Sequence, residues 1–164
     1  KVATDAFHVP LKGRLAELPK MIDAGLSRLR TLQHDDGGFG WWEKDASDAY
    51  MTAYVLHGLT RAMLVMADPA TAKAIANRAA GWLEKNWNTL GDQTLNAFAF
   101  MALADSGRAG ETDRRTMQSA PPGYRLAQAF ELRANVALHS ESMVAMLAKA
   151  LTEAATRDGL PGNA

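Results

Sequence analysis

Few side chains in this sequence are of the types, and at the spacing, that perform acid–base or metal chemistry. The close acid pairs are Asp35 with Asp36 and Asp45 with Asp48, and none forms an Asp-x-Asp-Asp or Asp-Asp-x-x-Asp motif. Asp48 is better explained as a helix N-cap and the other three as solvated loop acids. Two histidines three or four residues apart on a helix can bind a metal ion together. No two of the four histidines have this spacing, so we expect no metal site. They are His8, His34, His57 and His139.

Signatures of nucleophilic catalysis and nucleotide binding are also missing from the sequence. It has no cysteine, which excludes thiol nucleophiles and zinc sites built on thiolates. It has no Gly-x-Ser-x-Gly, and Ser140-Glu141-Ser142 fits a helix start better than a catalytic element. Neither Gly-x-x-x-x-Gly-Lys nor a strand-linked Gly-x-Gly-x-x-Gly occurs. We therefore expect no catalytic residue and no bound cofactor.

The charge balance argues against nucleic acid as a partner. The 164 residues contain 18 basic and 18 acidic side chains, for a formal net charge of zero. Such a chain has no electrostatic footprint for a phosphate backbone or an anionic membrane. We interpret the local basic cluster as a solvated face: Arg108, Arg114, Arg115 and Arg125.

The most specific stretch of the sequence is a glycine- and tryptophan-rich turn, and it is best interpreted as structural. Its glycines permit a sharp turn, while the phenylalanine and the two tryptophans are expected to bury large areas between neighbouring helical hairpins. The glutamine can bond carbonyls or amides that a tight turn leaves unsatisfied. A ligand-binding role for the tryptophans is the alternative. The residues are Gln33, Gly37, Gly38, Phe39, Gly40, Trp41 and Trp42.

The elements that must position this turn are helices. Ala, Leu, Met, Arg and Glu recur at helical spacing and strand signals are scarce, which predicts an all-α chain. A short helix within 1–18 is a further expectation. Caps and breakers predict helices over 19–33, 48–66, 69–87, 92–106, 111–119, 124–137 and 140–157.

Alternate helices differ in how much of their circumference is apolar. The helix over 48–66 carries Arg61 as its only charge after the cap, and the helix over 92–106 carries none between its terminal aspartates. Helices that are apolar nearly all round must be surrounded, whereas the first, third and seventh have a charged face and belong outside. Antiparallel hairpins that alternate outer and inner helices predict a toroid or a solenoid.

An outer helix ending in Leu-x-x-Gln, a Gly-Gly-Phe-Gly turn and an inner helix opening with Asp resemble the repeat unit of the α/α-toroid superfamily. That superfamily includes terpenoid cyclases, protein prenyltransferase β subunits and the thioester domains of complement-like proteins. A full toroid needs twice as many helices, so we expect a single domain over 1–164 that forms half of one. The resemblance is strongest over 21–67, and bacterial alpha-2-macroglobulins are most similar, on Trp41-Trp42 followed by Asp48, Tyr50, Thr52, Ala53 and Tyr54.

The resemblance implies a part of a large, exported protein of the periplasm or cell envelope that traps proteases. An attacking protease cleaves a bait segment, and the protein then changes shape around it. In some relatives a thioester between Cys and Gln couples covalently to the protease, protected from water by neighbouring domains. Since this chain has no cysteine, we expect a structural and interaction domain without enzymatic activity. The implied partners are the other domains of the parent protein and, through it, target proteases.

Two other functions fit an α/α toroid. One is a fragment of a terpenoid cyclase or a polysaccharide lyase. Sugar chemistry would need a tyrosine or paired carboxylates beside aromatic side chains, for which Tyr50, Tyr54, Trp41, Trp42 and Glu43 are the candidates. The other is a helical scaffold that only binds another protein. Whatever the function, an open arc leaves apolar ends uncovered, and we expect either a homodimer of the fragment or a rearranged fifth helix that covers the gap.

Overall fold

The computed structural model describes residues 17–88, 90–110, 121, 124–139 and 141–157. Within these residues it contains six α-helices and no β-strand, which confirms the predicted all-α fold. None of these helices combines the length and apolar character needed to cross a lipid bilayer. The helices are α2 (Leu18–Leu32), α3 (Ala49–Met63), α4 (Ala70–Asn86), α5 (Gln93–Asp105), α7 (Arg125–Ala137) and α8 (Glu141–Arg157).

The predicted and observed helix boundaries agree closely, with the largest difference at the end of α3. This helix ends at Met63 instead of continuing to residue 66. The N–H groups of Leu64 and Val65 donate to carbonyls three residues back, at 3.3 and 3.1 Å, which tightens the last turn and ends the helix. The helix predicted over 111–119, and nearly all of the one expected within 1–18, lie outside the described residues.

Aspartates begin the two most apolar helices. Asp48 precedes α3, and its carboxylate accepts a hydrogen bond from the N–H of Met51 at 2.9 Å. Asp92 does the same for α5 with the N–H of Leu95 at 3.0 Å. Each side chain satisfies an N–H group that has no partner inside the helix, and its negative charge is favourable at a helix N-terminus.

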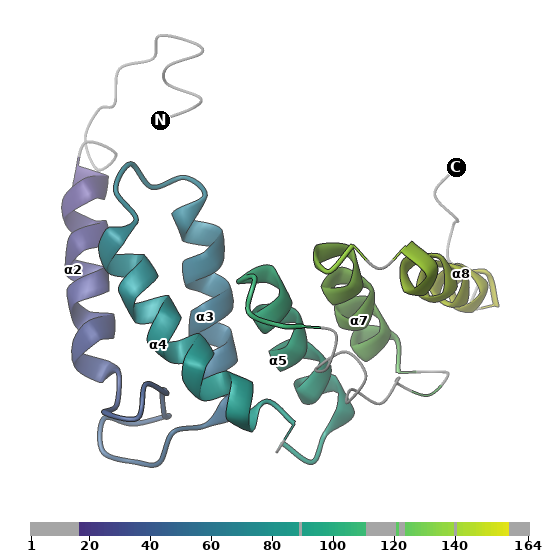
Figure 1. Ribbon diagram of the computed structural model, residues 1–164, viewed down its shortest axis with the longest axis horizontal. Helices are drawn as coiled ribbons and strands as arrows, with labels where there is room; N and C mark the ends of the chain where they lie inside the picture. Colours follow the sequence, from purple (N-terminus) through teal and green to yellow (C-terminus); the bar gives the residue numbers. More distant parts are fainter. Residues whose placement is uncertain (1–16, 89, 111–120, 122–123, 140, 158–164) are drawn as a thin grey trace, which may run out of the picture.

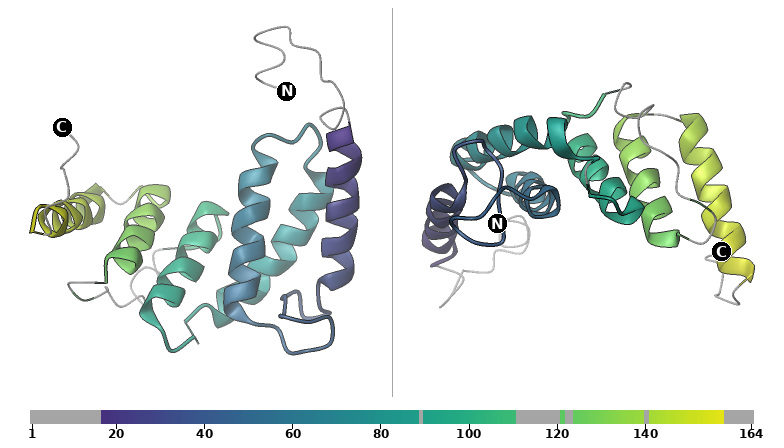
Figure 2. Two further views of the ribbon diagram at one scale, coloured as in Figure 1. Left: turned by 180° about the vertical axis from the view of Figure 1, so that it is seen from behind. Right: turned by 90° about the horizontal axis from the view of Figure 1, so that it is seen from below.

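The helices form a curved row (Figure 1). α2 packs on α4, α3 packs on both α4 and α5, α5 packs on α7, and α7 packs on α8. Seen from below, the row bends into an open arc with α2 and α8 at its ends (Figure 2). Each helix therefore contacts only its near neighbours in the row.

The centre of the row is α5, as its composition predicts. Eight consecutive residues of this helix, 97–104, are buried, so all of its faces are covered over that length. Phe100 and Leu103 are fully buried, and the ring of Phe100 lies 5.6 Å from that of Trp87, centroid to centroid. α3, α4 and α7 provide the neighbours that cover α5.

The expectation that α3 is surrounded in the same way is wrong. Its residues Leu56 and Leu59 are buried, but Tyr54 is 60% exposed, and Gly58 and Arg61 are exposed on the same side. The physical reason is that α4 and α5 cover only one side of α3. Its apolar composition does not reveal that the other side has no cover within the described chain.

Ion pairs connect the helices near the surface. Asp105 at the end of α5 pairs with Arg133 of α7 at 3.0 Å, and its Oδ2 lies 3.7 Å from Nδ1 of His57 on α3. Glu84 of α4 accepts two hydrogen bonds from Arg108, at 2.7 and 3.0 Å. Arg108 therefore pairs with an acid. The predicted basic cluster to which it belongs includes Arg114 and Arg115, which lie outside the described residues.

Candidate functional site

The turn between α2 and α3 carries most of the residues singled out in the sequence. At its start, the side chain of Gln33 binds the backbone of the turn and of α4. Gln33 is buried at the end of α2, and its Nε2 donates to the carbonyl oxygens of Gly37 at 2.9 Å and Ile75 at 3.0 Å. The first bond closes the turn, and the second joins it to α4. One amide group therefore fixes both the shape of the turn and its place on the fold.

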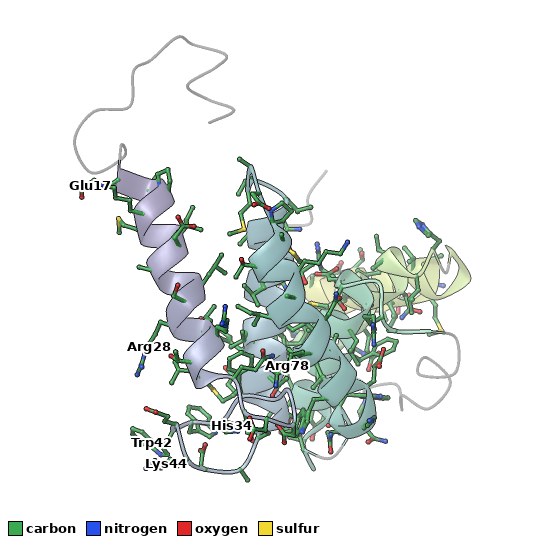
Figure 3. The ribbon with its side chains drawn as sticks, turned by 60° about the vertical axis from the view of Figure 1, so that its left-hand side comes forward. Glu17, Arg28, His34, Trp42, Lys44 and Arg78 are labelled. Atoms are coloured by element: carbon green, nitrogen blue, oxygen red, sulfur yellow. The ribbon has the colours of Figure 1, made fainter. Side chains whose placement is uncertain are left out.

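The side chain of Arg78, on α4, also binds the backbone of this turn. Arg78 donates from one guanidinium nitrogen to the backbone carbonyls of His34 at 2.9 Å and Asp35 at 3.1 Å. These carbonyls follow the end of α2, where backbone acceptors lack helical partners. Figure 3 shows Arg78 beside His34, with Trp42 and Lys44 at the outer edge of the loop. Nothing in the local sequence of the turn indicates the contribution of Arg78.

Close approach of neighbouring atoms explains all three glycines of the turn, and at Gly37 the backbone conformation also requires glycine. Gly37 has a φ of +97°, and a Cβ there would lie 2.7 Å from the carbonyl oxygen of Arg78. A Cβ on Gly38 would lie 2.5 Å from the side chain of Ser47, and one on Gly40 would overlap the carboxylate of Asp45. The turn is thus closed so tightly that larger residues would force it apart.

Phe39 is the apolar anchor of the turn, and Thr52 of α3 satisfies its backbone. Phe39 is 3% exposed, its N–H donates to Oγ1 of Thr52 at 2.9 Å, and the Thr52 hydroxyl donates back to its carbonyl at 3.3 Å. That carbonyl also accepts the N–H of Asp48 at 2.9 Å. Thr52 is fully buried. A polar residue on the apolar side of a predicted helix was the available signal for this role.

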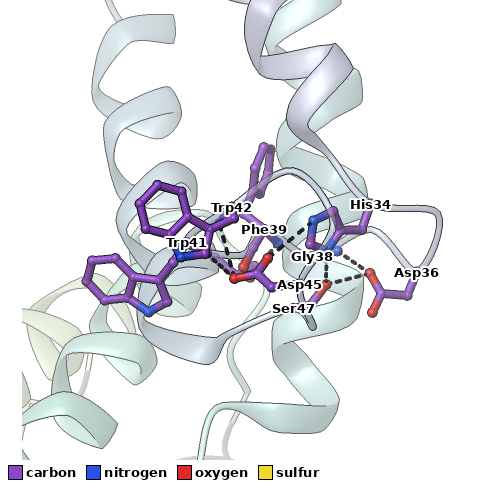
Figure 4. A network of polar contacts seen from close by, with 9 residues as sticks. His34, Asp36, Gly38, Phe39, Trp41, Trp42, Asp45 and Ser47 are labelled. Atoms are coloured by element: carbon purple, nitrogen blue, oxygen red, sulfur yellow. Dashed lines mark hydrogen bonds and ion pairs between the residues drawn. The ribbon is translucent and has the colours of Figure 1, made fainter.

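Two loop acids that were expected to be solvated also bind backbone N–H groups (Figure 4). Asp45 Oδ2 accepts from the N–H groups of Trp41 at 2.9 Å and Trp42 at 3.1 Å. Asp36 Oδ1 accepts from the N–H of Gly38 at 2.9 Å and from the hydroxyl of Ser47 at 2.8 Å. These bonds form because the turn leaves backbone donors without regular partners.

His34 lies between these two acids. Its Nδ1 is 2.9 Å from Ser47 Oγ, and its Nε2 is 3.8 Å from Asp45 Oδ1. Ser47 donates its only hydroxyl proton to Asp36, so it accepts from Nδ1 of His34. A nucleophilic serine needs the opposite direction, with its proton on the histidine side. The Ser–His–Asp grouping is therefore a structural network and not a catalytic triad.

The same contacts shift the pKa of Asp36. Burial raises it, but the hydrogen bonds from Gly38, Ser47 and Trp82, with the nearby His34, outweigh burial and leave the pKa below its ordinary value of 3.8. This direction stabilises the ionised carboxylate that the turn requires.

In the described part of the chain, no three His, Asp or Glu side chains are grouped so as to hold a metal ion.

The expectation that both tryptophans are buried between hairpins is wrong. Trp41 is 60% exposed and Trp42 is 79% exposed. Their backbone N–H groups are both held by Asp45, which points this part of the loop outward. Only Phe39 of the three aromatic residues enters the core.

Trp41 nonetheless has a neighbour on α3. Its ring is stacked on Tyr50 with 6.1 Å between centroids, and Tyr50 in turn lies 6.3 Å from Tyr54 and 5.8 Å from Phe98. We call these four residues the aromatic ledge. The contact between Trp41 and Tyr50 joins the exposed loop to α3.

Comparison with known proteins gives two similar relatives. The alpha-2-macroglobulin of Thermotoga maritima is 35% identical over 81 residues, which are 49% of this chain and 5% of that protein. The alpha-2-macroglobulin of Escherichia coli K12 is 48% identical over 42 residues, or 25% of this chain and 2% of that protein. The chain thus spans a small fraction of the length of either relative. No protein-family model and no solved structure matches it.

Proposed function

We propose that this chain is a structural and interaction domain of an alpha-2-macroglobulin-like protein that traps proteases. The observation that carries the proposal is the similarity to two bacterial alpha-2-macroglobulins, at 35% and 48% identity over part of the chain. The all-helical fold supports it, because the resembling thioester domains are built from helical hairpins. A place outside the cytoplasm, in the periplasm or cell envelope, is part of the same proposal.

In this function the chain contributes shape and no chemistry of its own. Three polar side chains of the turn are already engaged: Gln33 with two carbonyls, Asp45 with two backbone N–H groups, and Asp36 with Gly38 and Ser47. A covalent thioester, where the parent protein has one, would come from another segment, since this chain has no cysteine. Its other partners are the remaining domains of that protein.

The competing function, a toroid enzyme acting on sugars or terpenoids, has less support. Its acid or base would be a tyrosine or one of a pair of carboxylates beside the aromatic ledge, and the two acids that follow Glu43 in the sequence are already engaged. Asp45 accepts two backbone N–H groups there, and Asp48 caps α3. Carboxylates fixed in this way are poorly placed to donate or accept a substrate proton.

The test uses the longer protein that carries this chain. After incubation with a broad-specificity serine protease, we expect the bound protease to keep its activity on a small peptide substrate and to lose it on a large protein substrate. Phe100→Ala, which disrupts α5, should weaken this protection, whereas Trp42→Ala, at an exposed site, should not. Equal loss or equal retention of both protease activities by the unmodified protein would contradict trapping.

A further inference from the structure

The polar network of the turn between α2 and α3 contains one contact that lacks a hydrogen bond. Nε2 of His34 lies 3.8 Å from Oδ1 of Asp45 (Figure 4). Both atoms are buried, and neither has a hydrogen-bond partner within the described part of the chain. Buried polar atoms are nearly always paired. A proton between these two atoms would pair both of them at once.

The network is one proton short when His34 is neutral. Three contacts join its members in series, and each needs one proton between its two atoms. They run from Asp36 to Ser47, from Ser47 to His34, and from His34 to Asp45. The ionised carboxylates supply no proton, the serine hydroxyl supplies one, and a neutral imidazole supplies one. With Ser47 donating to Asp36 and Nδ1 of His34 donating to Ser47, Nε2 and Asp45 face each other as two acceptors.

The other neutral tautomer of His34 leaves a different contact without a proton. A proton on Nε2 would bond to Asp45, and Ser47 would then have to donate to Nδ1. The oxygens of Ser47 and Asp36, which lie 2.8 Å apart, would lose the proton between them. Two protons therefore cannot satisfy all three contacts. The imidazolium carries an N–H at both nitrogens and supplies the third proton.

Charged groups of both signs surround His34. The carboxylates of Asp36 and Asp45 lie at the two ends of its network. From α4, the guanidinium of Arg78 binds the backbone carbonyls of His34 and Asp35, and Asp35 itself is exposed. Among the described residues, the ring nitrogens make their polar contacts with the serine hydroxyl and with Asp45. The nearest polar atom to a proton on Nε2 is therefore a carboxylate oxygen.

We propose that protonation of His34 completes this network and fixes the exposed loop that carries Trp41 and Trp42. The imidazolium would donate from Nε2 to Oδ1 of Asp45, whose other oxygen already accepts the N–H groups of both tryptophans. One carboxylate thus connects the proton on the histidine to the loop. Histidine ordinarily titrates at about pH 6.5. The added bond is present in mild acid and is lost as the pH rises through the titration of His34, so the loop is held more firmly on the acid side.

An NMR titration of the 164-residue chain tests the coupling directly. The ring nitrogen signals of His34 report its protonation, and the backbone amide signals of Trp41 and Trp42 report the loop. Between about pH 5.5 and about pH 8, above the usual titration range of aspartate, we expect the two amide signals to shift with the same midpoint as the ring. Amide signals that stay unchanged while the ring titrates would overturn the proposal.

Asp45→Asn supplies the missing proton without a charge. Its amide oxygen can accept the N–H groups of Trp41 and Trp42, while its NH₂ group can donate to Nε2 of a neutral His34. From about pH 5.5 to about pH 8, the unfolding equilibrium constant of the wild type should rise at least about threefold more than that of Asp45→Asn. Urea unfolding at the two pH values measures this difference, and an equal rise in both proteins would contradict the proposal.

His57 provides the matched control. Its Nδ1 also lies near a carboxylate, 3.7 Å from Asp105, and its ring lies 6.0 Å from Phe98 of the aromatic ledge. His57→Gln should leave the tryptophan amide shifts in place, whereas His34→Gln should abolish them. Shifts that survive His34→Gln, or that disappear in His57→Gln, would overturn the proposal. These measurements involve no protease, so their outcome is independent of the proposed trapping function.

Discussion

Asp36 accepts two hydrogen bonds through a single oxygen, from the N–H of Gly38 and from the hydroxyl of Ser47. Asp45 likewise holds two successive N–H groups with one oxygen. At both residues the negative charge serves to satisfy backbone donors in a turn that has no helix or sheet ladder. The combination of histidine, serine and aspartate looks catalytic in composition, but the direction of each hydrogen bond determines that it is structural.

The lowered pKa of Asp36 makes the stability of the turn depend on pH. Its carboxylate ionises more readily in the folded chain than at the ordinary value of 3.8, so its contribution is fully present above that value. The contribution is lost as the pH falls through the folded-state pKa. Between about pH 5 and about pH 3, urea unfolding should show a steeper loss of stability for the wild type than for Asp36→Asn.

Asp35→Asn is the control for this comparison. It removes one carboxylate from an exposed neighbour in the same turn, and so reproduces the change in net charge. Equal slopes for the wild type and Asp36→Asn over this range would contradict the role assigned to the carboxylate of Asp36.

At the scale of the element, the burial of α5 predicts a large penalty for removing its side chains. Phe100 is fully buried, and Phe100→Ala should lower the free energy of unfolding by about 3–5 kcal/mol. Phe98, which is 9% exposed, should give a value in the same range or slightly lower. Thermal or urea unfolding measures the change, and a loss below about 1 kcal/mol would place α5 at the surface.

Trp42→Ala is the matched control, because it removes a still larger aromatic side chain from an exposed position. Since Trp42 is 79% exposed, the expected change is within about 0.5 kcal/mol. A large loss for this variant would mean that Trp42 packs against the fold.

How far the sequence predicts the elements depends on whether the signal is local. The starts of α3 and α5 follow from Asp48 and Asp92, because an N-cap acts within one turn of its helix. The burial of α5 follows from its uninterrupted apolar composition. The exposed side of α3 does not, because composition shows that a surface is apolar without showing what covers it. The contribution of Arg78 also escapes prediction, since this donor on α4 lies more than 40 residues from the carbonyls of His34 and Asp35 that it binds. The loop after Phe39 turns outward through a local contact, in which Asp45 accepts the N–H groups of Trp41 and Trp42.

At the scale of the whole molecule, the row arrangement distributes stability unevenly. The main cluster of buried side chains draws on α2, α3, α4 and α5, with Ala109 and Ala134 added from the residues beyond them. Among the described side chains of α8, only Leu147 is buried, and α8 packs on α7 alone among the helices described. In helical arrays of this kind, stability is a sum over neighbours, and the ends open first.

Native-state hydrogen exchange should therefore show a gradient along the row. Amides in α5, which has packed neighbours on all sides, should exchange most slowly, and amides in α8 should exchange fastest. A difference in opening equilibrium of at least about tenfold, or about 1.4 kcal/mol, is expected between the two helices. Uniform protection of α5 and α8 would mean that the row opens as one cooperative unit.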